Sequence, residues 1–255
     1  MGIAVVTGAS AGLGVEFVRQ LQHDPEVDEI WLVARREEPM QALADELTGA
    51  RGVVLPVDLA DADAVEVLAG RIAGAGADLR VLVNNAGYAI NRRFAETPIE
   101  DNMALLDVNV RALVRLTAAA LPGMTSGARI VQVASSIAFW PMPFFALYSA
   151  AKQFVVHFSR SLAPELQDRG VRLLCVCPGP VATEFWGVAG AGKPPPLVSW
   201  SAERLVRTSL RHLRGRRWLS LPGLIWWANE VFSRTVPSRI SATVIRWFNP
   251  YRGEA

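Results

Sequence analysis

The chain has 255 residues, of which 51% are hydrophobic and 20% are charged, so it can bury a sizeable core and is not disordered. Its formal net charge of +2 argues against a nucleic-acid-binding protein, and no apolar run approaches the roughly 18 residues of a membrane-spanning helix. Two cysteines, Cys175 and Cys177, cannot form a zinc site alone. We expect buried thiols, no metal and a cytoplasmic protein.

A glycine turn follows the first predicted strand, at residues 3–7, and precedes a helical pattern that reaches Leu21. In this context glycines let the backbone approach a pyrophosphate, and the helix N-terminus adds N–H donors and a favourable dipole. A plain tight turn is the alternative. The predicted cofactor residues of the turn are Gly8, Ser10, Gly12, Leu13 and Gly14.

The second predicted strand, residues 30–34, ends at Arg35 and Arg36, with no acid before Glu37. An acid at this position would bind a ribose 2′-hydroxyl, whereas a base accommodates a 2′-phosphate. The pair therefore favours NADP(H) over NAD(H). The alternative is that both arginines are surface charges.

Strands and helices then alternate, which predicts an α/β fold with a doubly wound parallel sheet in three α/β/α layers. The predicted helices are 38–47, 62–72, 99–121 and 147–167, and the further strands are 53–57, 79–83, 130–134 and 171–176. Ligands bind beyond the carboxyl ends of such strands. The candidate residues at these ends are Asp58, Leu59, Asn84, Ala86, Gly87, Ser135 and Pro178.

Tyr148 and Lys152 are four residues apart, so they share one face of the predicted helix 147–167. An ammonium beside a phenol lowers the phenol's pKa, which is ~10 in a free tyrosine. One lysine is unlikely to bring that pKa to neutrality, and an oxidised nicotinamide ring is a candidate second charge. Only two of the 26 basic residues are lysines, which favours a specific role for Lys152. A packed tyrosine beside a solvated lysine is the alternative.

These motifs together make residues 3–186 similar to the short-chain dehydrogenase/reductases, a family with the Rossmann fold. The residues that carry the resemblance are Thr7 to Gly14, Asn84 to Gly87, Asn109, Ser135, Tyr148 to Lys152, and Pro178 to Thr183.

The resemblance implies a role for each catalytic candidate. Tyr148 is expected to be the general acid in ketone reduction and the base in alcohol oxidation, and Lys152 to hold the nicotinamide ribose. Ser135 is expected to donate to the substrate oxygen, with Ser136 as the alternative. Asn109 is expected to interrupt its helix and to continue a proton path through a water. The implied cofactor contacts of the last motif are Pro178, Gly179, Val181 and Thr183, of which Val181 and Thr183 are expected to meet the nicotinamide carboxamide.

Substrate residues are not coded by a motif. Aromatic residues near Tyr148 suggest a bulky apolar substrate, and the alternative is that they belong to the core or to a subunit interface. The candidates, besides Ser135 and Tyr148, are Phe139, Trp140, Phe145 and Trp186. Glycines followed by three prolines predict a substrate lid at 187–200, after a catalytic core at 1–186.

The remaining stretch, 201–255, holds ten arginines and three acids and is rich in tryptophan. Similar extensions occur in the family subset related to bacterial oxidoreductases of the DltE type. Such a stretch can lie on an anionic membrane, cover the substrate pocket or form a subunit interface. The family resemblance also implies a homodimer or homotetramer.

The sequence thus predicts an NADP(H)-dependent oxidoreductase that interconverts a bulky ketone or aldehyde and an alcohol. A hydroxysteroid dehydrogenase or 3-oxoacyl reductase is the enzymatic alternative. An NADP-sensing regulator is the non-enzymatic one, and the intact set of Asn109, Ser135, Tyr148 and Lys152 argues against it.

Overall fold

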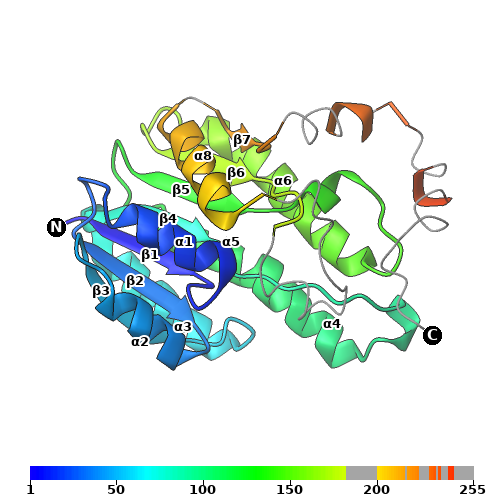
Figure 1. Cartoon of the computed structure of the whole chain (residues 1–255), viewed down its shortest axis with the longest axis horizontal. Coiled ribbons are helices and arrows are strands. Elements are labelled where there is room, and N and C mark those ends of the chain that lie inside the picture. The colour runs from blue at the N-terminus through cyan, green and yellow to red at the C-terminus, as the bar shows by residue number, and fades with distance from the viewer. Residues whose placement is uncertain (182–199, 216, 224–229, 234, 237–240, 244–255) are drawn as a thin grey trace.

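A computed structural model of the chain describes residues 1–181, 200–215, 217–223, 230–233, 235–236 and 241–243. Its centre is a seven-stranded, all-parallel sheet in the order β3-β2-β1-β4-β5-β6-β7 (Figure 1). The strands are β1 (Ile3–Thr7), β2 (Glu29–Ala34), β3 (Arg51–Pro56), β4 (Leu79–Asn84), β5 (Arg129–Val133), β6 (Arg172–Val176) and β7 (Leu219–Ser220). The predicted doubly wound fold is therefore confirmed.

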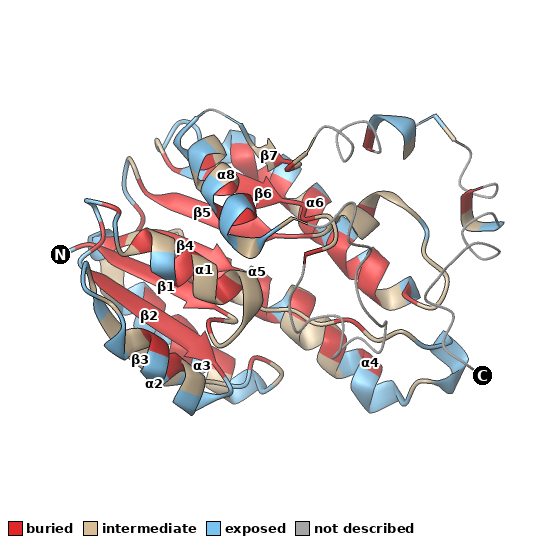
Figure 2. Cartoon of the chain, viewed as in Figure 1, coloured by how far each residue is buried: buried red, intermediate tan, exposed pale blue. Residues whose placement is uncertain are grey.

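Helices cover both faces of the sheet because the strands are apolar on both sides. The helices are α1 (Gly12–Leu21), α2 (Glu37–Asp45), α3 (Ala62–Ala75), α4 (Ile99–Leu106), α5 (Ala112–Ala120), α6 (Ala146–Glu165) and α8 (Ala202–Arg214). On β1, Val5 packs towards α3, α5 and α6, whereas Ala4 and Val6 pack towards α1, α2 and α8. The sheet is accordingly buried between two helical layers (Figure 2).

Two elements of the predicted C-terminal extension, α8 and β7, belong to this fold. α8 packs on α1 in the same apolar cluster, and β7 adds a seventh strand beside β6. The predicted lid, 187–200, lies outside the described residues except for Trp200. None of the helices in the described ranges combines the length and the apolar character that crossing a membrane requires.

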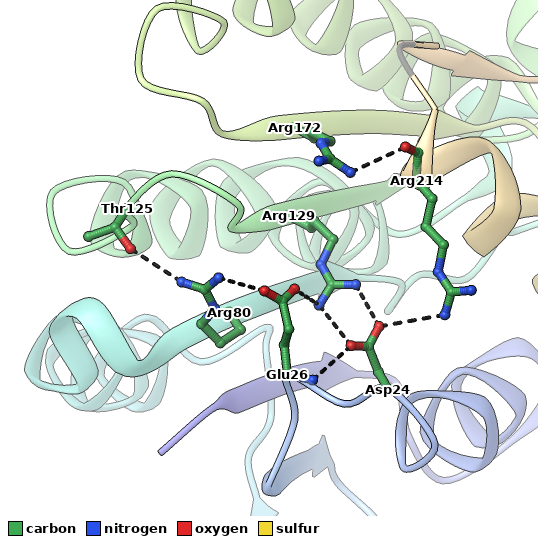
Figure 3. Close-up of polar contacts among 7 residues, drawn as sticks. All are labelled: Asp24, Glu26, Arg80, Thr125, Arg129, Arg172 and Arg214. Carbon is green, nitrogen blue, oxygen red and sulfur yellow. Dashed lines mark hydrogen bonds and ion pairs between the residues drawn. The ribbon is translucent and has the colours of Figure 1, made fainter.

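An ion-pair cluster ties the amino ends of the strands together (Figure 3). Arg129, at the start of β5, donates through both terminal nitrogens to Asp24, at 2.5 and 3.2 Å. Glu26 binds both Arg129, at 3.1 Å, and Arg80 of β4, at 3.0 Å. The side chains of Arg129 and Asp24 are only 6% and 8% exposed, so this pair joins the α1–β2 loop to β5 inside the protein.

Burial alone would raise the pKa of Asp24, but the hydrogen bond from Arg129 and the backbone N–H of Glu26 outweigh it. With the charges of Arg129 and Arg214, they hold the pKa of Asp24 below its ordinary value. A carboxyl with a lowered pKa stabilises the fold above the unfolded pKa, near 3.8, and loses that contribution as the pH falls through the folded pKa.

We predict that Asp24→Asn lowers the free energy of unfolding by roughly 3 kcal/mol at pH 7, because it leaves Arg129 buried opposite only the half-exposed Glu26. Urea unfolding measures the change. The matched control is Glu46→Gln, which removes the exposed Arg19–Glu46 pair and should cost about 0–1 kcal/mol. The difference between wild type and Asp24→Asn should shrink below pH ~4; equal costs for the two variants would contradict the assignment.

Candidate active site

The glycine turn after β1 is shaped by close backbone approaches. Gly8 has a φ of +70°, a left-handed conformation that favours glycine, and its N–H donates to the carbonyl of Val33 at 2.7 Å. A Cβ on Gly14 would lie 2.0 Å from the carbonyl oxygen of Gly8. Neither position accepts a side chain, so at these two points only backbone atoms lie beside the start of α1.

α1 begins at Gly12, and its N-cap residue, Ala11, makes no capping hydrogen bond through its side chain. The first N–H groups of a helix lack partners within the helix, and the helix dipole favours an anion there. The turn and this helix end therefore fit a pyrophosphate, as the sequence predicts. Ser10 lies in the turn, and Leu13 packs on the core beneath it.

Arg35 and Arg36 are both exposed at the carboxyl end of β2, within reach of the glycine turn. Arg36 donates to the carbonyl oxygen of Ser10 at 3.3 Å, which joins the second strand's end to the turn. Asp58, after β3, is exposed and accepts the N–H of Ala60 at 2.9 Å. Leu59 is buried in the core.

The segment after β4 divides its polar groups between the core and the site. The Asn84 side chain lies in the core and donates to Thr117 of α5 at 3.0 Å. Asn85, which belongs to the motif but is not among the predicted cofactor residues, donates to the carbonyl oxygen of Thr7 at 2.9 Å and so holds the glycine turn. The N–H of Ala86 donates to the Thr7 hydroxyl at 3.0 Å.

Gly87 lies beside two candidate catalytic side chains. A Cβ at this position would lie 2.6 Å from Oδ1 of Asn109 and 3.0 Å from Nζ of Lys152. The absence of a side chain therefore leaves room for the amide and the ammonium next to this backbone.

Ser135, Tyr148 and Lys152 come together at the carboxyl end of β5. The hydroxyls of Tyr148 and Ser135 are hydrogen-bonded, while Nζ of Lys152 lies 5.7 Å from the centre of the Tyr148 ring. Nζ donates to the carbonyl oxygen of Val133 at 3.0 Å. Tyr148 is only 6% exposed and Lys152 only 3%, so both polar groups lie inside the protein.

Burial sets the protonation of this pair. It raises the pKa of Tyr148 above its ordinary value, and the hydrogen bond with Ser135 offsets only part of that rise. It also lowers the pKa of Lys152 to about 8. Burial dominates the pKa of the phenol, so the lowering expected from Lys152 is not seen in the protein alone.

Asn109 lies in a π-helical turn, Asp107–Arg111, that separates α4 from α5. Its Nδ2 donates to the carbonyl oxygens of Leu105 and Tyr88, both at 3.0 Å. Its Oδ1 is buried and has no hydrogen-bond partner among the described residues. The helix predicted for 99–121 is thus interrupted where the resemblance implies, and Oδ1 of Asn109 and Nζ of Lys152 lie beside the same glycine, Gly87.

The chain returns to the site after β6. The carbonyl oxygen of Pro178 accepts the N–H of Ser136 at 2.8 Å, and Gly179 follows it. Val181 is buried and forms a parallel bridge with Trp200. Two predicted contacts, Thr183 and Trp186, lie outside the described residues. Cys175 and Cys177 are buried free thiols, as predicted, with their sulfurs 3.9 Å apart.

The predicted aromatic residues take three different positions. Phe145 is buried against Tyr148, with ring centres 6.5 Å apart. Phe139 packs on the core cluster around Cys175. Trp140 lies 6.1 Å from Phe232 of the C-terminal region. Of the three, only Phe145 is shown in ring contact with Tyr148.

A narrow pocket opens beside Tyr148, between the loop after β4 and the segment before α6. Its space is about 10 Å³, roughly the minimum for one water, so a substrate can enter only if side chains move. Sequence motifs gave no signal for its other residues. They are Ile90, Arg92, Phe94, Thr97, Asn102, Leu105, Phe144, Ala146 and Leu147.

Comparison with known proteins places this geometry among dehydrogenases. Residues 2–193 match the family model described as short chain dehydrogenase. Sulfoacetaldehyde reductase 2 of Chromohalobacter salexigens is 35% identical over 198 residues, which is 74% of this chain and 77% of the relative. The NADP-dependent 3-hydroxy acid dehydrogenase YdfG of Salmonella typhi is 34% identical over 194 residues, with coverage of 74% and 77%.

The fold is also similar to solved structures. A short-chain dehydrogenase from Sphingobium yanoikuyae, in complex with NADPH, superposes with a TM-score of 0.82 and 28% identity. The match covers 92% of this chain and 94% of the other.

We predict that Gly87→Ala lowers stability by roughly 1–3 kcal/mol and displaces Asn109 or Lys152, because the new Cβ overlaps Asn109 Oδ1. The matched control is Gly70→Ala in α3, where a Cβ meets nothing within 4 Å; it should stabilise the helix by about 0.5–1 kcal/mol. Urea unfolding of both variants measures the two changes, and a neutral or stabilising Gly87→Ala would refute the close approach.

Proposed function

This chain belongs to the short-chain dehydrogenase family, and from that premise we propose that it is an NADP(H)-dependent oxidoreductase interconverting a ketone or aldehyde and an alcohol. The observation that carries the proposal is the buried cluster in which Tyr148 is hydrogen-bonded to Ser135 and lies beside Lys152.

Tyr148 supplies the proton in the reducing direction. Its pKa is raised by burial, so the phenol is fully protonated at neutral pH, which is the form that a general acid requires. Ser135, hydrogen-bonded to the phenol, is in place to donate to the same carbonyl oxygen and to hold it at proton-transfer distance. A positioned acid of this kind contributes roughly 10²–10⁴-fold to the rate.

Lys152 and Asn109 serve the proton path behind Tyr148. The ammonium of Lys152 donates to Val133 and keeps donors free for a ribose hydroxyl. Oδ1 of Asn109 offers an acceptor beside Gly87, near the ammonium. When bound, the nicotinamide supplies or accepts the hydride. In alcohol oxidation, its positive charge and that of Lys152 both favour the phenolate that Tyr148 must become.

The cofactor is NADP(H). The exposed arginines at the end of β2 can accept a 2′-phosphate, and no acid precedes Glu37 to bind a ribose 2′-hydroxyl instead. The relatives support this choice, since YdfG is named as NADP-dependent and the Sphingobium structure contains NADPH.

The quaternary structure and surroundings are further parts of the proposal. A homodimer or homotetramer is supported by the outer face of α6, where Phe154 is 41% exposed and stacks on Phe158 at 5.8 Å.

Peripheral contact with an anionic membrane is supported by the exposed arginines of α8, namely Arg204, Arg207, Arg211 and Arg214.

Tyr148→Phe tests the mechanism. Turnover of carbonyl compounds should fall by roughly 10²–10⁴-fold because the proton donor is lost, while NADPH binding stays nearly unchanged. Quenching of tryptophan fluorescence measures binding, and NADPH oxidation measures turnover. Tyr88→Phe removes a nearby phenol as the control and should keep most of the turnover. Unchanged turnover in Tyr148→Phe would reject the mechanism, and a wild type that binds NADPH without turnover would favour the sensor.

Arg35→Asp tests the cofactor assignment. Replacing a cation with a carboxylate at the 2′-phosphate should raise the Kd for NADPH by about 10- to 100-fold, the range of a charge-assisted hydrogen bond, and change the Kd for NADH much less. Arg19→Asp, on the exposed side of α1, is the control. Equal effects on the two cofactors would mean that Arg35 does not meet the phosphate.

A further inference from the structure

A cationic side chain lines the same narrow pocket as Tyr148. The pocket walls are apolar at Ile90, Leu105 and Leu147, and Arg92 brings the positive charge. We propose that Arg92 binds an anionic group, such as a carboxylate, on the carbonyl substrate, which makes the substrate an oxo acid. This inference rests on the proposed function, because it takes Tyr148 to be the proton donor.

The backbone fixes Arg92 relative to Tyr148. The N–H of Arg92 donates to the carbonyl oxygen of Phe144 at 3.0 Å, which ties the loop after β4 to the segment that enters α6. Phe144 has a φ of +69°, a conformation that costs a non-glycine residue roughly 1–3 kcal/mol. A strained residue therefore holds the backbone of Arg92 to the segment that leads into the helix of Tyr148, so the two walls of the pocket keep a defined spacing.

The charge of Arg92 is available to a ligand. Its neighbour Arg93 pairs with Glu96 at 3.6 Å, so one arginine of the loop already faces a carboxylate. Throughout the described part of the chain, no carboxylate lies within ion-pair distance of Arg92. Arg92 is also exposed, so a charged group can reach it without being stripped of all its water.

The remaining lining fits a substrate with a polar outer end. Thr97 and Asn102 place a hydroxyl and a half-satisfied amide on the same pocket as Arg92. Apolar residues line the same pocket beside Tyr148. A planar guanidinium binds a carboxylate through two parallel hydrogen bonds, which would fix the orientation of the chain that carries the carbonyl.

The test uses straight-chain oxo acids of increasing length, each paired with its methyl ester, and NADPH as the reductant. Wild type should prefer the acid over the ester of the best length by roughly 10- to 100-fold in kcat/KM. Arg92→Met should remove this preference by raising KM for the acid while leaving kcat, and both constants for the ester, nearly unchanged. Arg92→Lys should restore part of the preference, and Arg93→Met is the matched control that should retain it.

The outcomes separate this inference from the proposed function. If wild type reduces esters and apolar ketones as well as or better than the acids at every length, the oxidoreductase stands and the role of Arg92 is wrong. Equal losses on acid and ester in Arg92→Met would mean damage to the loop and would also overturn the role. If wild type reduces no carbonyl compound while binding NADPH, both the proposed function and this inference fail.

Discussion

Burial of the Lys152 ammonium is the constraint on which the site depends. A charged amine inside a protein is unfavourable, and the lowered pKa of Lys152 is the direct sign of that cost. The surroundings supply one acceptor in return, the carbonyl oxygen of Val133 at the end of β5. Oδ1 of Asn109, in the π-helical turn, and Nζ of Lys152 both lie beside Gly87, at the position that a side chain there would occupy. The buried ammonium thus goes together with two unusual local features, a residue without a side chain and a widened helical turn.

The amino ends of the strands contribute to stability, whereas the carboxyl ends carry the candidate active site. At the amino ends of the strands, arginines and carboxylates neutralise one another, and Arg129 is almost fully enclosed (Figure 3). At the carboxyl ends, Arg35 and Arg92 are exposed, and Tyr148 and Lys152 are buried. The exposed arginines at these ends suit an anionic dinucleotide and a substrate that meets them there.

Periodicity and turn chemistry were enough to predict the parallel sheet, with the first six strands placed to within two residues of their observed ends. The same patterns predicted that Tyr148, Lys152 and Ser135 lie close together, because the carboxyl ends of parallel strands lie at the same end of the sheet. They did not show that Asn84 faces the core while Asn85 holds the glycine turn, since strand register decides which neighbour points where. Nor could they show that burial dominates the pKa of Tyr148, or that Arg92 and Phe144, 52 residues apart, are joined through their backbones.

The π-helical turn at Asp107–Arg111 has a consequence for how this chain can vary. Such a turn holds one residue more than an α-helix would over the same path. Deleting a single residue there would let α4 and α5 join into one regular helix, and would rotate one part against the other by about 100°. Asn109 would leave the buried side, while the outer surface of the helix would look almost unaltered. Natural variation must therefore preserve the number of residues in this turn if Asn109 is to keep its buried position.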